Sequence, residues 1–171
     1  CKAHKKLVDD SFMFIFWSMK YLSLAYQIFD VNRVIFWQQP NMVSSISGDF
    51  SYDITPIIVI RKGNPRLTKD AGLWDKSSVL NFTKPQGNYK KDKLCHNCQK
   101  PQALLEHLVW LSDADHEGNV IGDFFAGSGS LLRAVNKADV ILCDQNDEYY
   151  DKFFDVNVTD ERVYKCKKIV K

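Results

Sequence analysis

The chain has 171 residues, of which 45% are hydrophobic, and its formal net charge is +2. This length suffices for one sizeable hydrophobic core, and so small a net charge does not by itself indicate a nucleic-acid-binding protein. Five scattered cysteines, an odd number, are typical of a reducing compartment and argue against a disulfide framework. The most apolar stretch, Ser11–Leu24, is interrupted by Lys20, so no membrane-spanning segment is predicted.

The order of apolar and amphipathic segments predicts an α/β protein. Strands are expected at Phe12–Trp17, Arg33–Trp37, Thr55–Arg61, Val120–Phe124 and Val140–Cys143. Helices are expected at Met19–Phe29, Gln99–Leu111, Ser130–Asn136 and Asp147–Phe154. The last two strands flank a helix and form a β–α–β unit, so they should be parallel. The continuous apolar strands fit a mostly parallel sheet with helices on both faces, in one domain that contains a long loop at Lys62–Asn97.

The most informative segment is the turn Asp123–Ser130, which follows the fourth predicted strand. Gly127 and Gly129 can adopt positive φ, and the helix start behind them offers backbone N–H groups to a ligand. A Walker loop would need Lys-Ser/Thr after the last glycine, and a dinucleotide fingerprint would need a third glycine, which this turn lacks. An acid at the strand end suits a cationic amine, and Asp144 after the next strand can accept hydrogen bonds from ribose hydroxyls. A ligand with an amine, a ribose and no phosphate is S-adenosylmethionine.

An acid followed by Phe-Ala-Gly-Ser-Gly resembles the cofactor motif of the amino-group DNA methyltransferases, in the class with permuted motif order. The segment His96-Asn-Cys-Gln-Lys-Pro101 is similar to the signature that opens the helix before this motif, and Trp74–Val79 and Lys84–Asn88 resemble the stretch that precedes it. Three upstream segments resemble later strands of that class, in its order: Asp10–Trp17, Val34–Asn41 and Tyr52–Ile60.

This resemblance implies a Rossmann-like, S-adenosylmethionine-dependent methyltransferase of restriction-modification type. It would methylate the exocyclic amino group of adenine (preferred) or cytosine in DNA, after the target base leaves the stack. The implied cofactor-binding residues are Asp123, Phe124, Phe125, Ala126, Gly127, Ser128, Gly129, Asp144, Gln99 and Lys100. Asp123 would take the methionine amine, Asp144 the ribose hydroxyls, and Lys100 would close the pocket near the methionine carboxylate.

The chain departs from the family pattern in three places. Phe124 stands where the family usually has proline, and Asn97 stands where it has the proline after His96. The catalytic tetrapeptide with its Pro-Pro pair is absent, so no catalytic residue is assigned. We expect that motif upstream of Cys1, which makes the single domain N-terminally incomplete. The alternatives are a catalytically inactive subunit with a binding or structural role, and a methyltransferase of RNA or protein.

Partners follow from the charge distribution together with the resemblance. Lysines and arginines form two groups: Lys84, Lys90, Lys91, Lys93 and Lys100; and Arg61, Lys62, Arg66 and Lys69. Each group is either solvated loop charge or a set of phosphate contacts, so DNA is the predicted partner. A homo- or hetero-oligomer is left open, and the expected location is the cytoplasm or the nucleoid. Cys95 and Cys98 look like half a zinc site without a second pair, so no metal is predicted. Trp17 and Trp37 lie at strand ends, where they either stack on a ligand or pack in the core.

Overall fold

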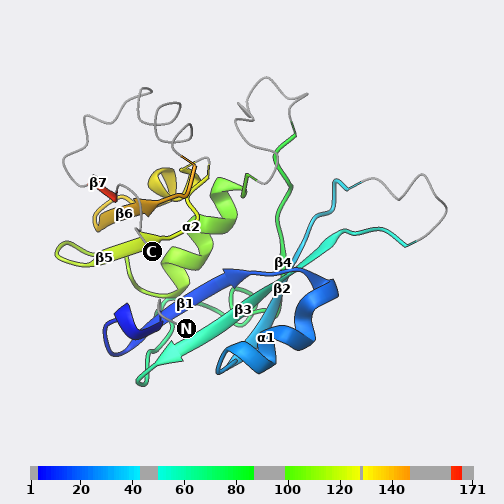
Figure 1. Cartoon of the computed structure of the whole chain (residues 1–171), viewed down its shortest axis with the longest axis horizontal. Coiled ribbons are helices and arrows are strands. Elements are labelled where there is room, and N and C mark those ends of the chain that lie inside the picture. Colours follow the sequence, from blue (N-terminus) through cyan, green and yellow to red (C-terminus); the bar gives the residue numbers. More distant parts are fainter. Residues whose placement is uncertain (1–3, 43–49, 87–98, 128, 147–162, 167–171) are drawn as a thin grey trace. The chain divides into compact units, whose positions relative to one another are not determined.

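The computed structural model describes residues 4–42, 50–86, 99–127, 129–146 and, for the backbone alone, 163–166. It divides the chain into two compact units, Cys1–Lys84 and Pro85–Lys171, and each unit contains its own sheet (Figure 1). In these described ranges, no helix combines the length and apolar character needed to cross a bilayer. The prediction of one domain stays a prediction.

The first unit contains a mixed sheet with the strand order β1-β3-β2-β4. Its elements are η1 (His4–Lys6), β1 (Ser11–Phe16), η2 (Met19–Tyr21), α1 (Leu22–Ile28), β2 (Arg33–Gln38), β3 (Ile54–Lys62) and β4 (Val79–Asn81). β3 pairs antiparallel with both β1 and β2, whereas β2 and β4 are parallel. β1 and β2 therefore run in the same direction, as expected for strands joined through a helix, and β3 is inserted between them. The predicted mostly parallel sheet is wrong for this unit.

The core of the first unit lies where α1 packs on the sheet. Ala25 of α1 and Ile58 and Ile60 of β3 are almost fully buried in one cluster. Met13 is opposite Ile60 in the β1–β3 register, so both side chains lie on the face that α1 covers. Ile57, on the other face of β3, is also fully buried. Continuous burial on both faces explains why β3 is apolar throughout its centre rather than alternating.

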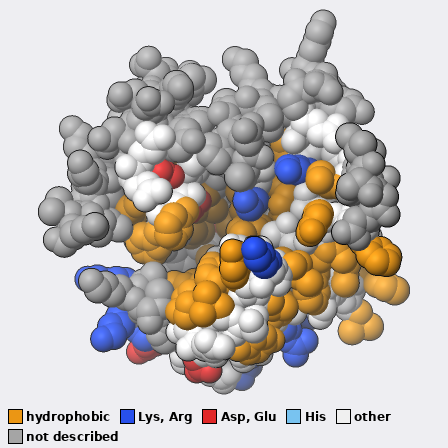
Figure 2. All heavy atoms as spheres, turned by 45° about the vertical axis from the view of Figure 1, so that its right-hand side comes forward, with side chains coloured by type: hydrophobic (Ala, Val, Ile, Leu, Met, Phe, Trp, Pro, Cys, Tyr) orange, Lys and Arg blue, Asp and Glu red, His pale blue; other side chains and the backbone are white. Residues whose placement is uncertain are grey.

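Several hydrophobic side chains of the first unit lie at its surface. α1 exposes Leu24, Tyr26 and Ile28 by 41, 59 and 48% of their areas. In the view of Figure 2, exposed hydrophobic side chains lie among Lys and Arg side chains. The outer side of α1 is therefore partly apolar.

The second unit contains a parallel sheet with the strand order β5-β6-β7. Its elements are α2 (Gln102–Leu111), β5 (Val120–Asp123), η3 (Ser130–Ala134), β6 (Asp139–Cys143) and β7 (Val163–Cys166). The core cluster joins Val109 of α2 and Leu131 of η3 to Val140 and Leu142 of β6. The predicted parallel pairing of β5 with β6 is confirmed, but the element between them is a short 3₁₀ turn rather than the predicted α-helix.

The structure corrects the predicted elements in several places. All five predicted strands form, but β4 lies inside Lys62–Asn97, which had been expected to be loop, and β7 was not predicted at all. The helix expected at Gln99–Leu111 begins at Gln102, since Pro101 lacks a backbone N–H and stands at its N-cap. The helix expected at Ser130–Asn136 is a five-residue 3₁₀ turn. The helix expected at Asp147–Phe154 lies outside the described residues.

Candidate functional site

Two carboxylates follow the ends of the two adjacent parallel strands in the second unit. Asp123 is the last residue of β5, and Asp144 directly follows β6. In the parallel register Asp123 is opposite Leu142, so both acids lie at the same edge of the sheet. The carboxyl ends of parallel strands are where α/β sheets usually place their ligands. The tertiary structure therefore brings together the two acids that the sequence singled out.

Three hydrogen bonds hold the loop after β5 at this edge, and a fourth lies in the loop after β6. The backbone N–H of Ala126 donates to the Cys143 carbonyl over 2.9 Å, and that of Gly127 donates to Asp144 Oδ2 over 2.8 Å. Asp123 Oδ1 accepts the N–H of Phe125 over 3.0 Å. Asp144 Oδ1 also accepts the N–H of Asn146, over 3.0 Å. Each carboxylate thus holds its own part of the loop backbone, a role that the sequence did not indicate for Asp144.

The glycines of the loop adopt the conformation predicted for them. Gly127 has φ 45° and Gly129 has φ 64°, both in the left-handed region that favours glycine. The Gly129 N–H donates to the Ala126 carbonyl over 2.7 Å, which closes the turn before η3. Because η3 is one short 3₁₀ turn that ends at Ala134, it supplies no extended helix dipole behind the loop. A helix start does follow the glycines, as predicted, but it is of 3₁₀ type, and its role as a source of N–H groups for a ligand stays a prediction.

Asp123 has an electrostatic environment suited to a cation. Burial raises the pKa of its carboxyl above the ordinary value. The hydrogen bond from Phe125 and the charge of Lys100 lower this pKa in part, and the charge of Asp144 raises it again. An ionised Asp123 is therefore destabilised in the protein alone, and a positive ligand group beside it would remove part of that cost.

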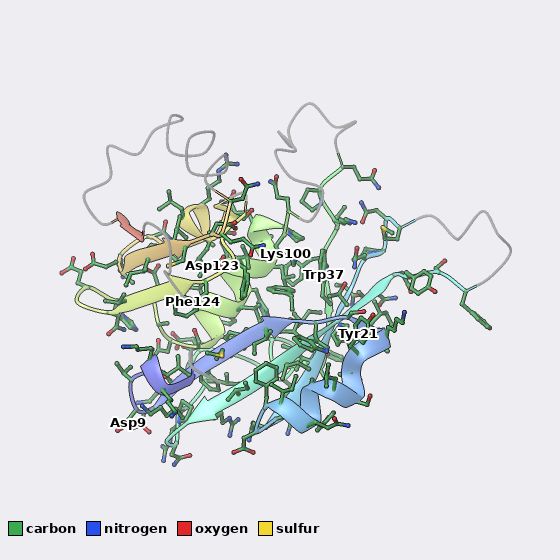
Figure 3. The ribbon with its side chains drawn as sticks, viewed as in Figure 1. Asp9, Tyr21, Trp37, Lys100, Asp123 and Phe124 are labelled. Atoms are coloured by element: carbon green, nitrogen blue, oxygen red, sulfur yellow. The ribbon has the colours of Figure 1, made fainter. Side chains whose placement is uncertain are left out.

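The side chains of the loop differ in burial. Phe125 is 85% exposed and Phe124 36% exposed, so neither is a core residue. Ala126 is half-buried and packs against the core cluster of the second unit. Ser128 lies outside the described residues. Figure 3 labels Asp123, Phe124 and Lys100, all in the second unit.

The residues before α2 contribute one predicted and one unpredicted contact. Lys100 lies close enough to Asp123 to lower its pKa, and Gln99 beside it is half-buried. Gln102, which the sequence did not single out, donates from Nε2 to the Arg133 carbonyl of η3 over 3.1 Å and to Glu106 over 2.7 Å. This amide joins α2 to the turn behind the glycine loop. Its position as the first residue after Pro101 is the signal that could have pointed to it.

Several other predicted residues have structural partners in the first unit. Lys62 donates to the Leu7 carbonyl and lies 3.4 Å from Asp9, and Arg61 lies over the ring of Phe12. The indole nitrogens of both tryptophans at strand ends donate to backbone carbonyls: Trp17 to Tyr21 and Trp37 to Phe82. Trp37 is 3% exposed, so packing is the correct one of its two interpretations.

The cysteine pair that resembles half a zinc site, for which no metal was predicted, lies outside the described residues. Cys95, His96 and Cys98 lie outside the described residues, as do Lys90, Lys91 and Lys93. In the described part of the chain, no group of three or more His, Cys, Asp or Glu side chains is arranged to hold a metal ion.

Residues 1–155 match the model of a family described as DNA methylase. The chain belongs to this family. A type II methyltransferase, M.HpaI from Haemophilus parainfluenzae, is 24% identical over 204 residues, which cover 96% of this chain. The chain spans 62% of the length of that relative.

Several solved structures share the fold of this chain. The M1.HpyAVI–SAM complex superimposes with a TM-score of 0.67 at 21% identity, over 87% of this chain and 75% of that one. The cytosine-N4-specific PvuII methyltransferase gives a TM-score of 0.66 at 15% identity, over 92% and 68% of the two chains. Membership of the family and this α/β methyltransferase fold agree with the resemblance inferred from the motifs.

Proposed function

We propose that this chain is the cofactor-binding part of an S-adenosylmethionine-dependent DNA methyltransferase that acts on the exocyclic amino group of adenine or cytosine. The observation that carries the proposal is the pair Asp123 and Asp144, which lie at one edge of a parallel sheet and hold a glycine loop between them. Support comes from the family match over residues 1–155 and from the relatives, one solved with SAM and one named cytosine-N4-specific.

The chemistry of the site fits S-adenosylmethionine. This ligand carries an ammonium group and a sulfonium, both positive, and a ribose with two hydroxyls. In the described part of the chain, the hydrogen bond from Phe125 is the one that the Asp123 side chain accepts, so Oδ2 is available for the ammonium. Asp144 would accept ribose hydroxyls while it continues to hold the loop.

The remaining residues of the proposed site have supporting roles. Lys100, whose charge acts on Asp123, would pair with the ligand carboxylate and so balance the two acids. The backbone of Phe125, Ala126 and Gly127 would line the methionine portion, and Gln99, Phe124, Ser128 and Gly129 complete the proposed set. When bound, the cofactor supplies an electrophilic methyl group, and the acceptor amine must be presented by residues outside this set.

Substrate and assembly are inferred from the family. DNA is the proposed acceptor, and the lysine and arginine side chains of the loops are the proposed phosphate contacts. The proposed location is the cytoplasm or the nucleoid. A Rossmann-like arrangement with helices on both faces is proposed on the same basis. The one specific observation that favours the alternative of an inactive subunit is that none of the five prolines in the sequence is adjacent to another.

Calorimetry with S-adenosylmethionine tests the cofactor site. We expect the wild-type chain to bind, and Asp123→Ala to lose about 100-fold in affinity, since a charge-assisted contact to the ammonium is removed. Asp139→Asn is the matched control, because Asp139 lies in the same sheet at the opposite end of β6. Absence of binding by the wild-type chain, or equal loss in both variants, would contradict the assignment.

Methyl transfer separates the proposed activity from its alternatives. The protein that contains this chain, with any sequence upstream of Cys1, is incubated with methyl-labelled cofactor and DNA, RNA or protein as acceptor. Label in adenine or cytosine of DNA supports the proposal, whereas label in RNA or protein alone assigns the acceptor elsewhere. Cofactor binding without transfer to any acceptor favours the binding or structural subunit.

A further inference from the structure

One turn of the first unit exposes two large apolar side chains. Leu73 and Trp74 are 91 and 92% exposed, whereas the three other tryptophans of the sequence are at most 39% exposed. Side chains of this size forgo much of their hydrophobic stabilisation when they stay in water. Such a pair therefore requires an explanation that an isolated surface leucine does not.

The turn that carries them is built into the unit. Pro65, Thr68 and Ala71 are buried at every third position, so the segment before the tip is anchored to the unit. The Gly72 N–H donates to Asp75 Oδ2 over 2.8 Å, and the Ser77 N–H donates to the Trp74 carbonyl over 3.1 Å. The tip thus has a defined backbone that holds both side chains outward.

The anchoring continues at the two ends of the segment. The Asn64 N–H donates to Asp10 Oδ1 over 2.6 Å, before the turn. After the turn, the Ser78 carbonyl accepts the Phe36 N–H of β2 over 2.7 Å, and the chain enters β4. A side chain presented from such a frame loses less entropy on binding than one on a loose loop.

Exposed charges around the tip are mainly positive. Arg66, Lys69 and Lys76 are exposed and flank Leu73 and Trp74 in the sequence. Asp70 is the exposed acid of this segment, while the half-buried Asp75 accepts the hydrogen bond from Gly72. An aromatic tip among cations complements a polyanion with flat apolar bases, because phosphates take the cations and bases stack on the indole.

We infer that the Leu73–Trp74 tip is a DNA-contacting element, which stacks on or wedges between bases while Arg66, Lys69 and Lys76 contact phosphates. The inference rests on the proposed function, and it assigns part of the DNA surface to the first unit rather than to the glycine loop. Apolar side chains are a recurrent means of unstacking bases, a step that an enzyme requires when it acts on a base amino group inside a duplex.

The test is fluorescence anisotropy with a labelled DNA duplex of mixed sequence. Leu73→Ser/Trp74→Ser should weaken binding about tenfold or more, as expected for loss of base stacking. Leu24→Ser/Tyr26→Ser is the matched control, because it removes a similar pair from the exposed face of α1 and should leave the affinity unchanged. Trp74→Phe keeps a stacking ring and should recover most of the affinity. Thermal melts should match the wild type, since both replaced side chains lie in solvent.

Two further measurements identify the groups that meet the DNA. Indole emission should be quenched on DNA addition in the wild type and not in Trp74→Phe. Replacing Arg66, Lys69 and Lys76 with Gln should reduce the slope of log affinity against log salt by about 1 for each phosphate that is no longer neutralised.

The outcomes separate this inference from the proposed function. Equal DNA affinity of the wild type and the serine pair would overturn the inference while the methyltransferase proposal stands. A wild-type chain that binds S-adenosylmethionine but no DNA would overturn the DNA proposal and this inference with it. Unchanged DNA binding together with a changed sedimentation coefficient of the serine pair would assign the tip to contact between copies of the chain, which also overturns the inference.

Discussion

The two sheets of this chain differ in where their strand directions place the ends of neighbouring strands. In the parallel β5–β6 pair, both carboxyl ends lie at one edge, and this edge gathers Asp123, Asp144 and the glycine loop. In the first sheet, β3 runs antiparallel to β1 and β2, so neighbouring strands place opposite ends at each edge. Parallel strands bring the residues that follow their carboxyl ends together at one edge of the sheet. The antiparallel pairing of β3 instead builds a core that is apolar on both faces of this strand.

The largest expected effect concerns the core around β3 in the mixed sheet of the first unit. Ile58→Ala removes a fully buried side chain beneath α1 and should lower the free energy of unfolding by about 2 to 5 kcal/mol. Ile54→Ala, at the 40%-exposed start of the same strand, should cost about 0.5 kcal/mol or less. Chemical denaturation measures both. Similar costs at the two positions would contradict the core assigned to β3.

The next effect concerns the start of β6, at the end of the β5–β6 pair opposite to the glycine loop. Asp115 accepts the backbone N–H groups of Asn136, Lys137 and Ala138 before β6. Burial alone would raise its pKa, but these hydrogen bonds outweigh burial and lower it. Asp115→Ala should cost about 2 kcal/mol at neutral pH, because three donors lose a charged acceptor.

This contribution should also depend on pH. A lowered pKa means that the stabilisation is present above the ordinary value of 3.8 and is lost as the pH falls through the folded-state value. Glu117→Ala, in the same loop and exposed, is the control and should change little. A cost of Asp115→Ala that persists undiminished in strong acid would argue against the carboxylate as its source.

A smaller effect is expected when the glycine loop loses its hydrogen bond to Asp144. Asp144→Ala removes the acceptor for Gly127 and Asn146, and with it the proposed ribose contact. We expect about tenfold weaker binding of S-adenosylmethionine, equivalent to about 1.4 kcal/mol. Amide hydrogen exchange at Gly127 should accelerate in the same variant, and a purely ribose-binding Asp144 would leave that exchange rate unchanged.

The smallest effect separates stability from binding at Asp123. Because its pKa is raised, the folded chain holds this proton more tightly than the unfolded chain, so stability falls as the pH rises above 3.8 through the folded-state value. Asp123→Asn removes this cost and keeps an oxygen for the Phe125 N–H. The variant should melt at a slightly higher temperature than the wild type at pH 7, with the difference vanishing below pH 3.8, while its cofactor affinity falls. A variant less stable than the wild type at pH 7 would refute the electrostatic argument.

The accuracy of the sequence-based predictions depended on the range of the interactions involved. β1, β2, β3, β5 and β6 were predicted because each contains a run of apolar residues long enough to identify by itself. β4 has three residues, and it is a strand because it pairs with β2 in register from Phe36 to Gln38. No local pattern in so short a segment indicates that pairing.

The sequence by itself determined Asp123, Asp144 and the positive φ of Gly127 and Gly129. Each of these features depends on the chemistry of a single residue at or just after a strand end. Only the tertiary structure decided that Asp144 accepts the Gly127 N–H, that β3 lies antiparallel between β1 and β2, and that η3 is a single 3₁₀ turn. The physical reason is that these features join segments distant in the chain, and their free energies come from packing and hydrogen bonds that no local propensity contains.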